Sequence, residues 1–158
     1  MRPSKAVLAI NTLLEGRRLT AYQDTGGVWT IGEGHTMGVK QGDVATNAQV
    51  DKWVRQDFMK ADACLKTIYP GPLAQRQVDA LTLFINNVGV NAFATSTLLR
   101  RMQEQHFDEV PKELARWNHD RGRVVPGLTV RRAVEALIWE GHIDAIDAQT
   151  VAVLRRMV

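Results

Sequence analysis

The chain has 158 residues, the length of one ordinary domain, and 45% of them are hydrophobic, which is enough to form a core. Its net charge of +3 and its pI near 9.3 suit an anionic partner, such as a bacterial cell wall or nucleic acid, and do not separate the two. The single cysteine, Cys64, excludes an intramolecular disulfide. The four histidines are too scattered to form a metal-binding motif, so we expect neither a metal nor a cofactor.

The first 70 residues carry signals for two helices with a hairpin between them. Apolar residues recur at helical spacing from Pro3 to Gly16, where the first helix should end. Residues 19–23 and 28–32 are rich in strand-forming residues and flank a turn, which predicts a hairpin. The sequence Thr46-Asn-Ala-Gln49 is a capping box that should begin a long helix, which ends before Pro70.

The rest of the chain has the pattern of helices with short connections. Residues 73–88 are apolar around much of the helical circumference, which predicts a core helix. A short helix that ends near Trp117, a loop over 118–127 and a helix that opens at Thr129 should follow. After Gly141, an amphipathic pattern predicts one more helix. We therefore expect an α+β fold that is mostly helical, in a single domain.

Two carboxylates lie at boundaries between the first predicted elements. Glu15 ends the first helix, and Asp24 begins the turn Asp-Thr-Gly-Gly. Hydrolysis of a glycosidic bond needs one protonated carboxyl group and one ionised carboxylate, in different environments. The negative end of the helix dipole disfavours a charge on Glu15, whereas the nearby Arg17 and Arg18 act in the opposite direction. Taken singly, each acid is more often a capping or surface residue than a catalyst.

The spacing of the two acids belongs to a longer motif. Asp24 follows Glu15 after eight residues, Thr30 follows after five more, and Ile31-Gly-Glu-Gly-His35 comes next. This pattern resembles the bacteriophage lysozymes, or endolysins, of the T4- and P22-like glycoside hydrolase family 24. The resemblance extends over roughly residues 4–140. Further stretches that agree with it are Asn87-Val88-Gly89, Ser96 to Arg100, Trp117, and Gly127 to Arg132 with Glu135.

The resemblance implies a two-lobed, lysozyme-like fold. A small lobe with the hairpin would span about residues 15–45, and a connecting helix about residues 46–69. A larger helical lobe would take up residues 70–158, all within the single catalytic domain 1–158. The sugar-binding cleft would lie between the two lobes.

The resemblance also implies the reaction and the roles of three residues. The reaction would be hydrolysis of the β-1,4 bond between N-acetylmuramic acid and N-acetylglucosamine in peptidoglycan. Glu15 would be the general acid, Asp24 the second carboxylate, and Thr30 a hydroxyl that helps to hold the attacking water. The best-matched relatives invert the anomeric centre, which requires about 6.5 to 9.5 Å between the carboxyl groups.

Four further residues are predicted to bind substrate, and His35 is predicted to be structural, buried and hydrogen-bonded. For Asn86 the alternative is helix C-capping, and for Ser96 it is helix N-capping. Arg131 is chosen because family members place a basic group from this region near the general acid. Thr36, beside His35, completes the predicted set.

The expected partner is the peptidoglycan glycan strand, bound by a monomer, with no role for nucleic acid. The apolar run near the N-terminus is too short to span a membrane and lacks a signal-peptide cleavage site. We therefore expect accumulation in the host cytoplasm until a holin releases the enzyme. The C-terminal basic helix, with Arg155 and Arg156, should pack on the helical lobe, and the alternative is weak contact with envelope lipid.

Two other functions stay open from the sequence. A lytic transglycosylase would need only one glutamic acid, so Asp24 and Thr30 would be dispensable. A basic module built on residues 121–140 would bind nucleic acid or the wall without catalysis. Glu33 stands where relatives usually carry an apolar or aromatic residue, and we expect a solvated turn residue there.

Overall fold

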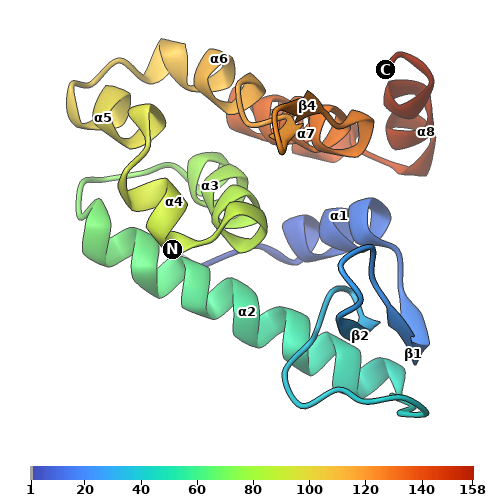
Figure 1. Cartoon of the computed structure of the whole chain (residues 1–158). Coiled ribbons are helices and arrows are strands. Elements are labelled where there is room, and N and C mark those ends of the chain that lie inside the picture. Colours follow the sequence, from blue (N-terminus) through green and yellow to red (C-terminus); the bar gives the residue numbers. More distant parts are fainter. Residues whose placement is uncertain (1) are drawn as a thin grey trace.

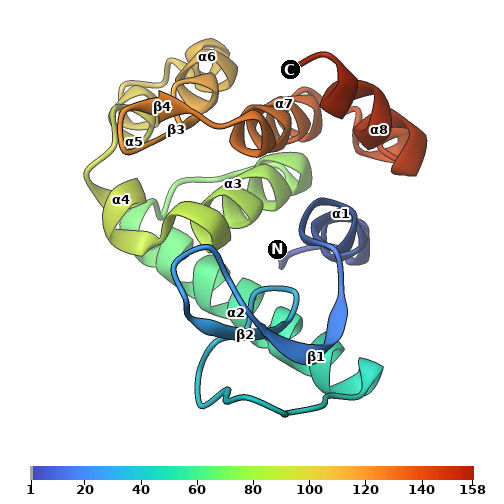
Figure 2. The ribbon, with the colours of Figure 1, turned by 45° about the vertical axis from the view of Figure 1, so that its right-hand side comes forward.

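A computed structural model of the chain describes residues 2–158 and confirms a mostly helical α+β fold with a small antiparallel hairpin (Figures 1 and 2). Its α-helices are α1 (Lys5–Glu15), α2 (Asn47–Ile68), α3 (Gln75–Val88), α4 (Val90–Ala94), α5 (Thr97–Gln103), α6 (Val110–Ala115), α7 (Pro126–Glu140) and α8 (Ala148–Arg156). Its strands are β1 (Arg18–Gln23), β2 (Trp29–Gly32), β3 (His119–Asp120) and β4 (Arg123–Val124), and its 3-10 helices are η1 (Phe107–Glu109) and η2 (Ile143–Ala145).

The first helix, α1, is closed at both ends by local interactions, and it ends where the sequence predicted. The Ser4 side chain caps the N-terminus by accepting a hydrogen bond from the Val7 backbone N–H at 3.2 Å. At the other end Gly16 has φ 70°, a conformation that glycine adopts without strain. As a result Glu15 is the last helical residue, directly before the chain turns into β1.

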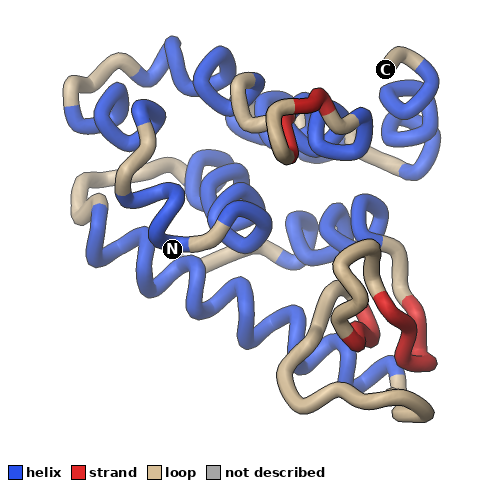
Figure 3. Tube along the Cα trace, in the orientation of Figure 1, coloured by secondary structure: helices blue, strands red, loops and turns tan. Residues whose placement is uncertain are grey.

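The hairpin of β1 and β2 forms a separate small unit (Figure 3). Tyr22 pairs with Thr30 in the antiparallel ladder, and the register is irregular further along, between Arg18 and Tyr22. A small apolar cluster of its own lies beneath the hairpin. The buried members of this hairpin cluster are Ile31, Ala45 and Val50.

Helix α2 connects this hairpin to the rest of the molecule (Figure 1). The predicted capping box is confirmed, because Thr46 accepts from the Gln49 backbone N–H and the Gln49 side chain accepts from the Thr46 backbone N–H. Val50 near the start of α2 belongs to the hairpin cluster, whereas Phe58 and Leu65 belong to the main core. One helix therefore contributes to both apolar clusters.

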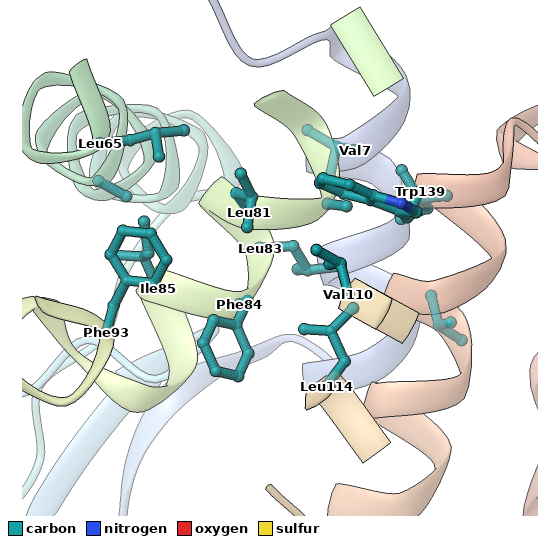
Figure 4. Close-up of a cluster of buried hydrophobic side chains, with 14 of the residues drawn as sticks. Val7, Leu65, Leu81, Leu83, Phe84, Ile85, Phe93, Val110, Leu114 and Trp139 are labelled. Carbon is teal, nitrogen blue, oxygen red and sulfur yellow. The ribbon is translucent and has the colours of Figure 1, made fainter. Parts of the chain in front are cut away.

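The main core surrounds α3 (Figure 4). All residues from Val78 to Ile85 are buried, as expected for a helix that is apolar on most of its circumference. Phe84 meets Phe93 and Trp117 edge to face, with ring centroids 6.4 and 5.4 Å away. Through this contact Trp117 packs against the core.

Two connections differ from the sequence-based expectation, and the last helix packs as expected. A short hairpin of two-residue strands, β3 with β4, occupies part of the predicted loop 118–127, and α7 begins at Pro126 rather than at Thr129.

In α8, Val151 is buried, and Arg155 donates to the carbonyls at the end of α1 at 3.1 and 3.3 Å. The last helix therefore packs on the molecule. Among residues 2–158, no helix is long and apolar enough to cross a membrane.

Replacement of Phe84 by alanine tests the central place of α3. The side chain is fully buried, so Phe84→Ala should lower the free energy of unfolding by about 3–5 kcal/mol through lost burial and a residual cavity. Urea denaturation measures the change. The control is Val153→Ala on α8, where the side chain is 39% exposed and the expected change is within about 0.5 kcal/mol. Equal costs for the two variants would contradict this description of the core.

Candidate active site

Glu15 emerges from the end of α1 with its side chain 31% exposed, and Arg131 of α7 reaches it. An Arg131 guanidinium N–H donates to Glu15 Oε1, and the arginine side chain is almost fully buried. The structure thus places the predicted basic group beside this acid. A buried cation in contact with the carboxyl group can stabilise the negative charge that remains once Glu15 has given up a proton.

A groove of about 450 Å³ opens beside Glu15, within the size range of small-molecule sites. It lies between the end of α1, the turn after β2, the middle of α2 and the junction of α3 with α4. Its polar lining combines carboxylates, one ammonium group and two side-chain amides. These polar residues are Glu15, Asp57, Lys60, Asn86 and Asn87, and Glu33 borders the groove with its carboxylate buried.

Asn86 lines this groove, and it does not cap α3. The C-cap of α3 is Gly89, with φ 88°, so the capping alternative for Asn86 is wrong. Asn87, which the sequence analysis quoted only as part of a motif, lines the same groove. The two amides lie where they can donate and accept hydrogen bonds with a ligand next to Glu15.

Asp24 sits at the exposed hairpin turn, outside the set of residues that line the Glu15 groove. Its Oδ1 accepts hydrogen bonds from the backbone N–H groups of Gly26 and Val28, both at 2.8 Å. These two donors fix the position of the carboxylate within the turn. Within residues 2–158, no hydrogen bond reaches Oδ2, which leaves that oxygen able to accept from a water or a sugar hydroxyl.

Thr30 is buried in β2, with only 4% of its surface exposed. Its hydroxyl donates to the Val28 carbonyl at 3.0 Å, on the same short segment that binds Asp24. The two predicted catalytic residues of the hairpin are therefore fixed through one shared backbone residue, Val28.

The other predicted site residues lie elsewhere. Ser96 caps α5, where its hydroxyl accepts from the Leu99 N–H at 3.0 Å, and it borders a groove that does not contain Glu15. Thr36 is exposed in the turn after β2. His35 is half-buried rather than buried, and its ring stacks on Trp53 with centroids 4.3 Å apart, in place of the expected side-chain hydrogen bond.

Comparison with known proteins decides the family. A family model described as Phage lysozyme matches residues 12–135. The chain belongs to the phage lysozyme family. An endolysin of Acyrthosiphon pisum secondary endosymbiont phage 1 is 35% identical over 144 residues, which cover 89% of this chain and 99% of that protein. A SAR-endolysin of Pseudomonas phage phiKMV is 37% identical and covers 82% of this chain and 83% of its own length.

The solved structures agree with this assignment. The muramidase domain of SpmX from Asticaccaulis excentricus superimposes with a TM-score of 0.81 at 32% identity. The match covers 87% of this chain and 97% of that domain. The fold is therefore lysozyme-like, and the chain is a lysozyme-type glycoside hydrolase.

Beside the Glu15–Arg131 contact, this lysozyme contains a buried ionic group that the sequence analysis did not identify as such. Arg132 donates to Glu135 Oε1 at 2.8 Å and to Asn87 Oδ1 at 2.7 Å. Burial raises the pKa of Glu135 to about 8, and burial also lowers the pKa of Arg132. Because Asn87 lines the groove, the group connects α7 to the groove wall. The only feature of the sequence that could have indicated this pair is the spacing of Arg132 and Glu135, because side chains three residues apart are neighbours on a helix.

The polar side chains of this lysozyme do not form a cluster of metal ligands. In the part of the chain that the structure describes, residues 2–158, no three His, Cys, Asp or Glu side chains gather closely enough to hold a metal ion. The groups that the Glu15 groove and its surroundings offer to a ligand are carboxyl, amide, ammonium and guanidinium groups.

Replacement of Glu135 by glutamine tests the protonation of the buried carboxyl. Its native pKa of about 8 lies above the ordinary value of 4.5, so between these values the native state holds a proton that the unfolded chain has lost. The contribution of Glu135 to the free energy of unfolding should then fall as pH rises from about 4.5 to 8, by at most about 1.4 kcal/mol per pH unit. Glu135→Gln cannot ionise and should lack this slope.

Urea denaturation at several pH values, for the wild type and the Glu135→Gln variant, measures the difference between their stabilities. Parallel curves over this range would show that Glu135 has the same charge in the native and unfolded states, contrary to the expectation.

Proposed function

We propose that this chain is a phage endolysin, a muramidase that hydrolyses the β-1,4 bond between N-acetylmuramic acid and N-acetylglucosamine in peptidoglycan. The family assignment and the names of its relatives support the substrate class. The observation that carries the proposal is the position of Glu15: its carboxyl group contacts a buried cation and borders a groove that two side-chain amides also line.

In the proposed reaction, Glu15 donates a proton to the oxygen of the leaving sugar. The carboxylate that results is stabilised by the guanidinium of Arg131, which already contacts it. Arg131 thus acts on the acid itself, in addition to the substrate-binding role expected from the sequence. The amides of Asn86 and Asn87 are suited to the acetamido groups of the sugar chain, because an amide can donate and accept at once.

Asp24 and Thr30 supply the second half of the mechanism. Asp24, held in its hydrogen-bonded turn, accepts a proton from the attacking water, and Thr30 orients this water through its hydroxyl. Water attack from the face opposite the leaving group inverts the anomeric carbon. Thr36, which is exposed and follows β2, is proposed to contact the substrate.

The remaining proposals concern the organisation and setting of the enzyme. A hairpin lobe of about residues 15–45 and a helical lobe of about residues 70–158 act as the two walls of the substrate site, joined by the helix within 46–69. The enzyme works as a monomer on glycan strands and does not use nucleic acid. Its release from the host cytoplasm by a holin remains a prediction from the sequence.

Replacement of the proposed acid and base tests the mechanism. Glu15→Gln and Asp24→Asn should each lower the rate of peptidoglycan hydrolysis by about 10²- to 10⁴-fold, because each removes a proton donor or acceptor. Turbidity of outer-membrane-permeabilised cells measures the rate, and circular dichroism checks the fold. Full activity of Glu15→Gln would contradict the role of Glu15 as the general acid.

Analysis of the products separates the hydrolase from a lytic transglycosylase. Digestion of peptidoglycan in ¹⁸O-labelled water, followed by mass spectrometry, should show labelled reducing ends on the muramic acid residues. Anhydromuramic ends without label, together with full activity of Asp24→Asn and Thr30→Ala, would assign the chain to the transglycosylases instead.

A further inference from the structure

The proposed catalytic residues are divided between two apolar clusters. Helix α1, which ends in Glu15, packs in the main core through Val7 and Ile10. Thr30, by contrast, belongs to the hairpin, whose cluster is separate from that core. Val54 is partly buried and packs against both clusters. Apolar contacts are not directional, so Val54 alone does not fix the orientation of the hairpin relative to α1.

A buried carboxylate, Glu33, lies at the contact between the hairpin and α1. We call this contact, formed by Glu33, Arg17, Asn11 and Thr12, the joint. The Glu33 side chain, in the turn directly after β2, is fully buried, contrary to the expected solvated position. Its Oε2 accepts from Asn11 Nδ2 at 2.9 Å, and its Oε1 accepts from Thr12 Oγ1 at 2.8 Å. Both donors lie in α1, close to Glu15 along the helix. A side chain of the hairpin lobe is thus hydrogen-bonded to the helix that carries the acid.

Arg17 completes the joint and extends it to the third element. Its Nε and Nη2 donate to Glu33 Oε1 at 2.9 and 2.7 Å. The same guanidinium donates to Asn47 Oδ1 at 3.1 Å and to Asp51 Oδ1 at 2.7 Å, in the first turns of α2. Charge-assisted hydrogen bonds of this kind are both stronger and more directional than neutral or apolar contacts. Four segments therefore meet at one ion pair: α1, the link between α1 and β1 that carries Arg17, the turn after β2, and α2.

We propose that Glu33, together with Arg17, is a positioning residue that sets the separation between Glu15 and the Asp24–Thr30 pair. Glu33 is three residues from Thr30, and its partner Thr12 is three residues from Glu15, so the path from the joint to each side of the site is short. A rotation of the hairpin about this joint would change the gap in which water must fit. The catalytic part of this inference rests on the proposed function.

The test compares Glu33→Gln with a matched variant, Glu113→Gln. Both remove one buried carboxylate that contacts an arginine, but Glu113 of α6 pairs with Arg116 at the end of the same helix, far from the joint along the chain. In Glu33→Gln, the new amide nitrogen would face donors where the carboxylate accepts. Since a misplacement of about 1 Å can cost about 10²-fold, Glu33→Gln should lower kcat by about 10- to 100-fold and change KM much less. Glu113→Gln should leave kcat unchanged at a temperature where both variants are folded.

A second measurement reports the geometry without catalysis. Spin labels at the exposed positions Ala6 on α1 and Thr20 on β1, in a Cys64→Ala background, give the distance distribution between the two sides of the joint. This distribution should broaden or shift in Glu33→Gln and stay unchanged in Glu113→Gln.

The outcomes of these experiments are distinct. Wild-type kcat in Glu33→Gln, or a lowered kcat with an unchanged distance distribution, would overturn the positioning role. If Glu33→Gln does not fold, Arg17→Lys takes its place, because lysine keeps the charge beside Glu33 and cannot reach Asn47 and Asp51 at the same time. It should broaden the distribution and lower kcat, and failure to do both would overturn the inference. Failure of the proposed function would show separately, as Glu15→Gln with full activity and an altered distance distribution in Glu33→Gln.

Discussion

The arrangement of this molecule depends on the need to bury α3. All residues of this helix from Val78 to Ile85 are buried, so other helices must cover it on several sides. Helices α1, α2 and α7 provide that cover, although they come from distant parts of the chain. The end of α1 carries Glu15, α7 carries Arg131, and the end of α3 carries Asn86. Packing around one apolar helix therefore brings Glu15 and Asn86 to a single groove and Arg131 into contact with Glu15.

Buried charges surround this groove on two sides, which is costly for stability. Removal of charged groups from water is only partly offset by pairing, and an apolar group of similar size is often at least as stabilising. Arg132 is nevertheless buried in α7 beside Glu135, whose raised pKa keeps it protonated at neutral pH, and Glu33 with Arg17 lies at the joint of the hairpin. Directional hydrogen bonds fix positions more closely than apolar packing does. We infer that these charges serve the geometry of the site more than the stability of the fold.

The two proposed catalytic acids lie in contrasting surroundings, as acid and base catalysis requires. Glu15 borders a groove and faces a buried guanidinium, whereas Asp24 lies in an exposed turn with two backbone N–H donors on one oxygen. The acid belongs to the main core and the base to the hairpin, so the protein can adjust the two environments separately. The distance between the two acids then depends on how the hairpin is held against α1, which is where Glu33 lies.

Local features were determined by the sequence itself: the Ser4 cap, the capping box at Thr46, the end of α1 at Gly16, and the hairpin turn at Asp24. Each depends on residues within one or two turns of one another, and the acid–acid–hydroxyl spacing that indicated the family is equally local. Tertiary structure alone decided that Glu33 is buried, and it brings Arg131 to Glu15, a residue 116 positions away, a contact that only the family resemblance had indicated. Such partners depend on how separate helices pack, and periodicity along one helix carries no information about the charges that another helix brings to it.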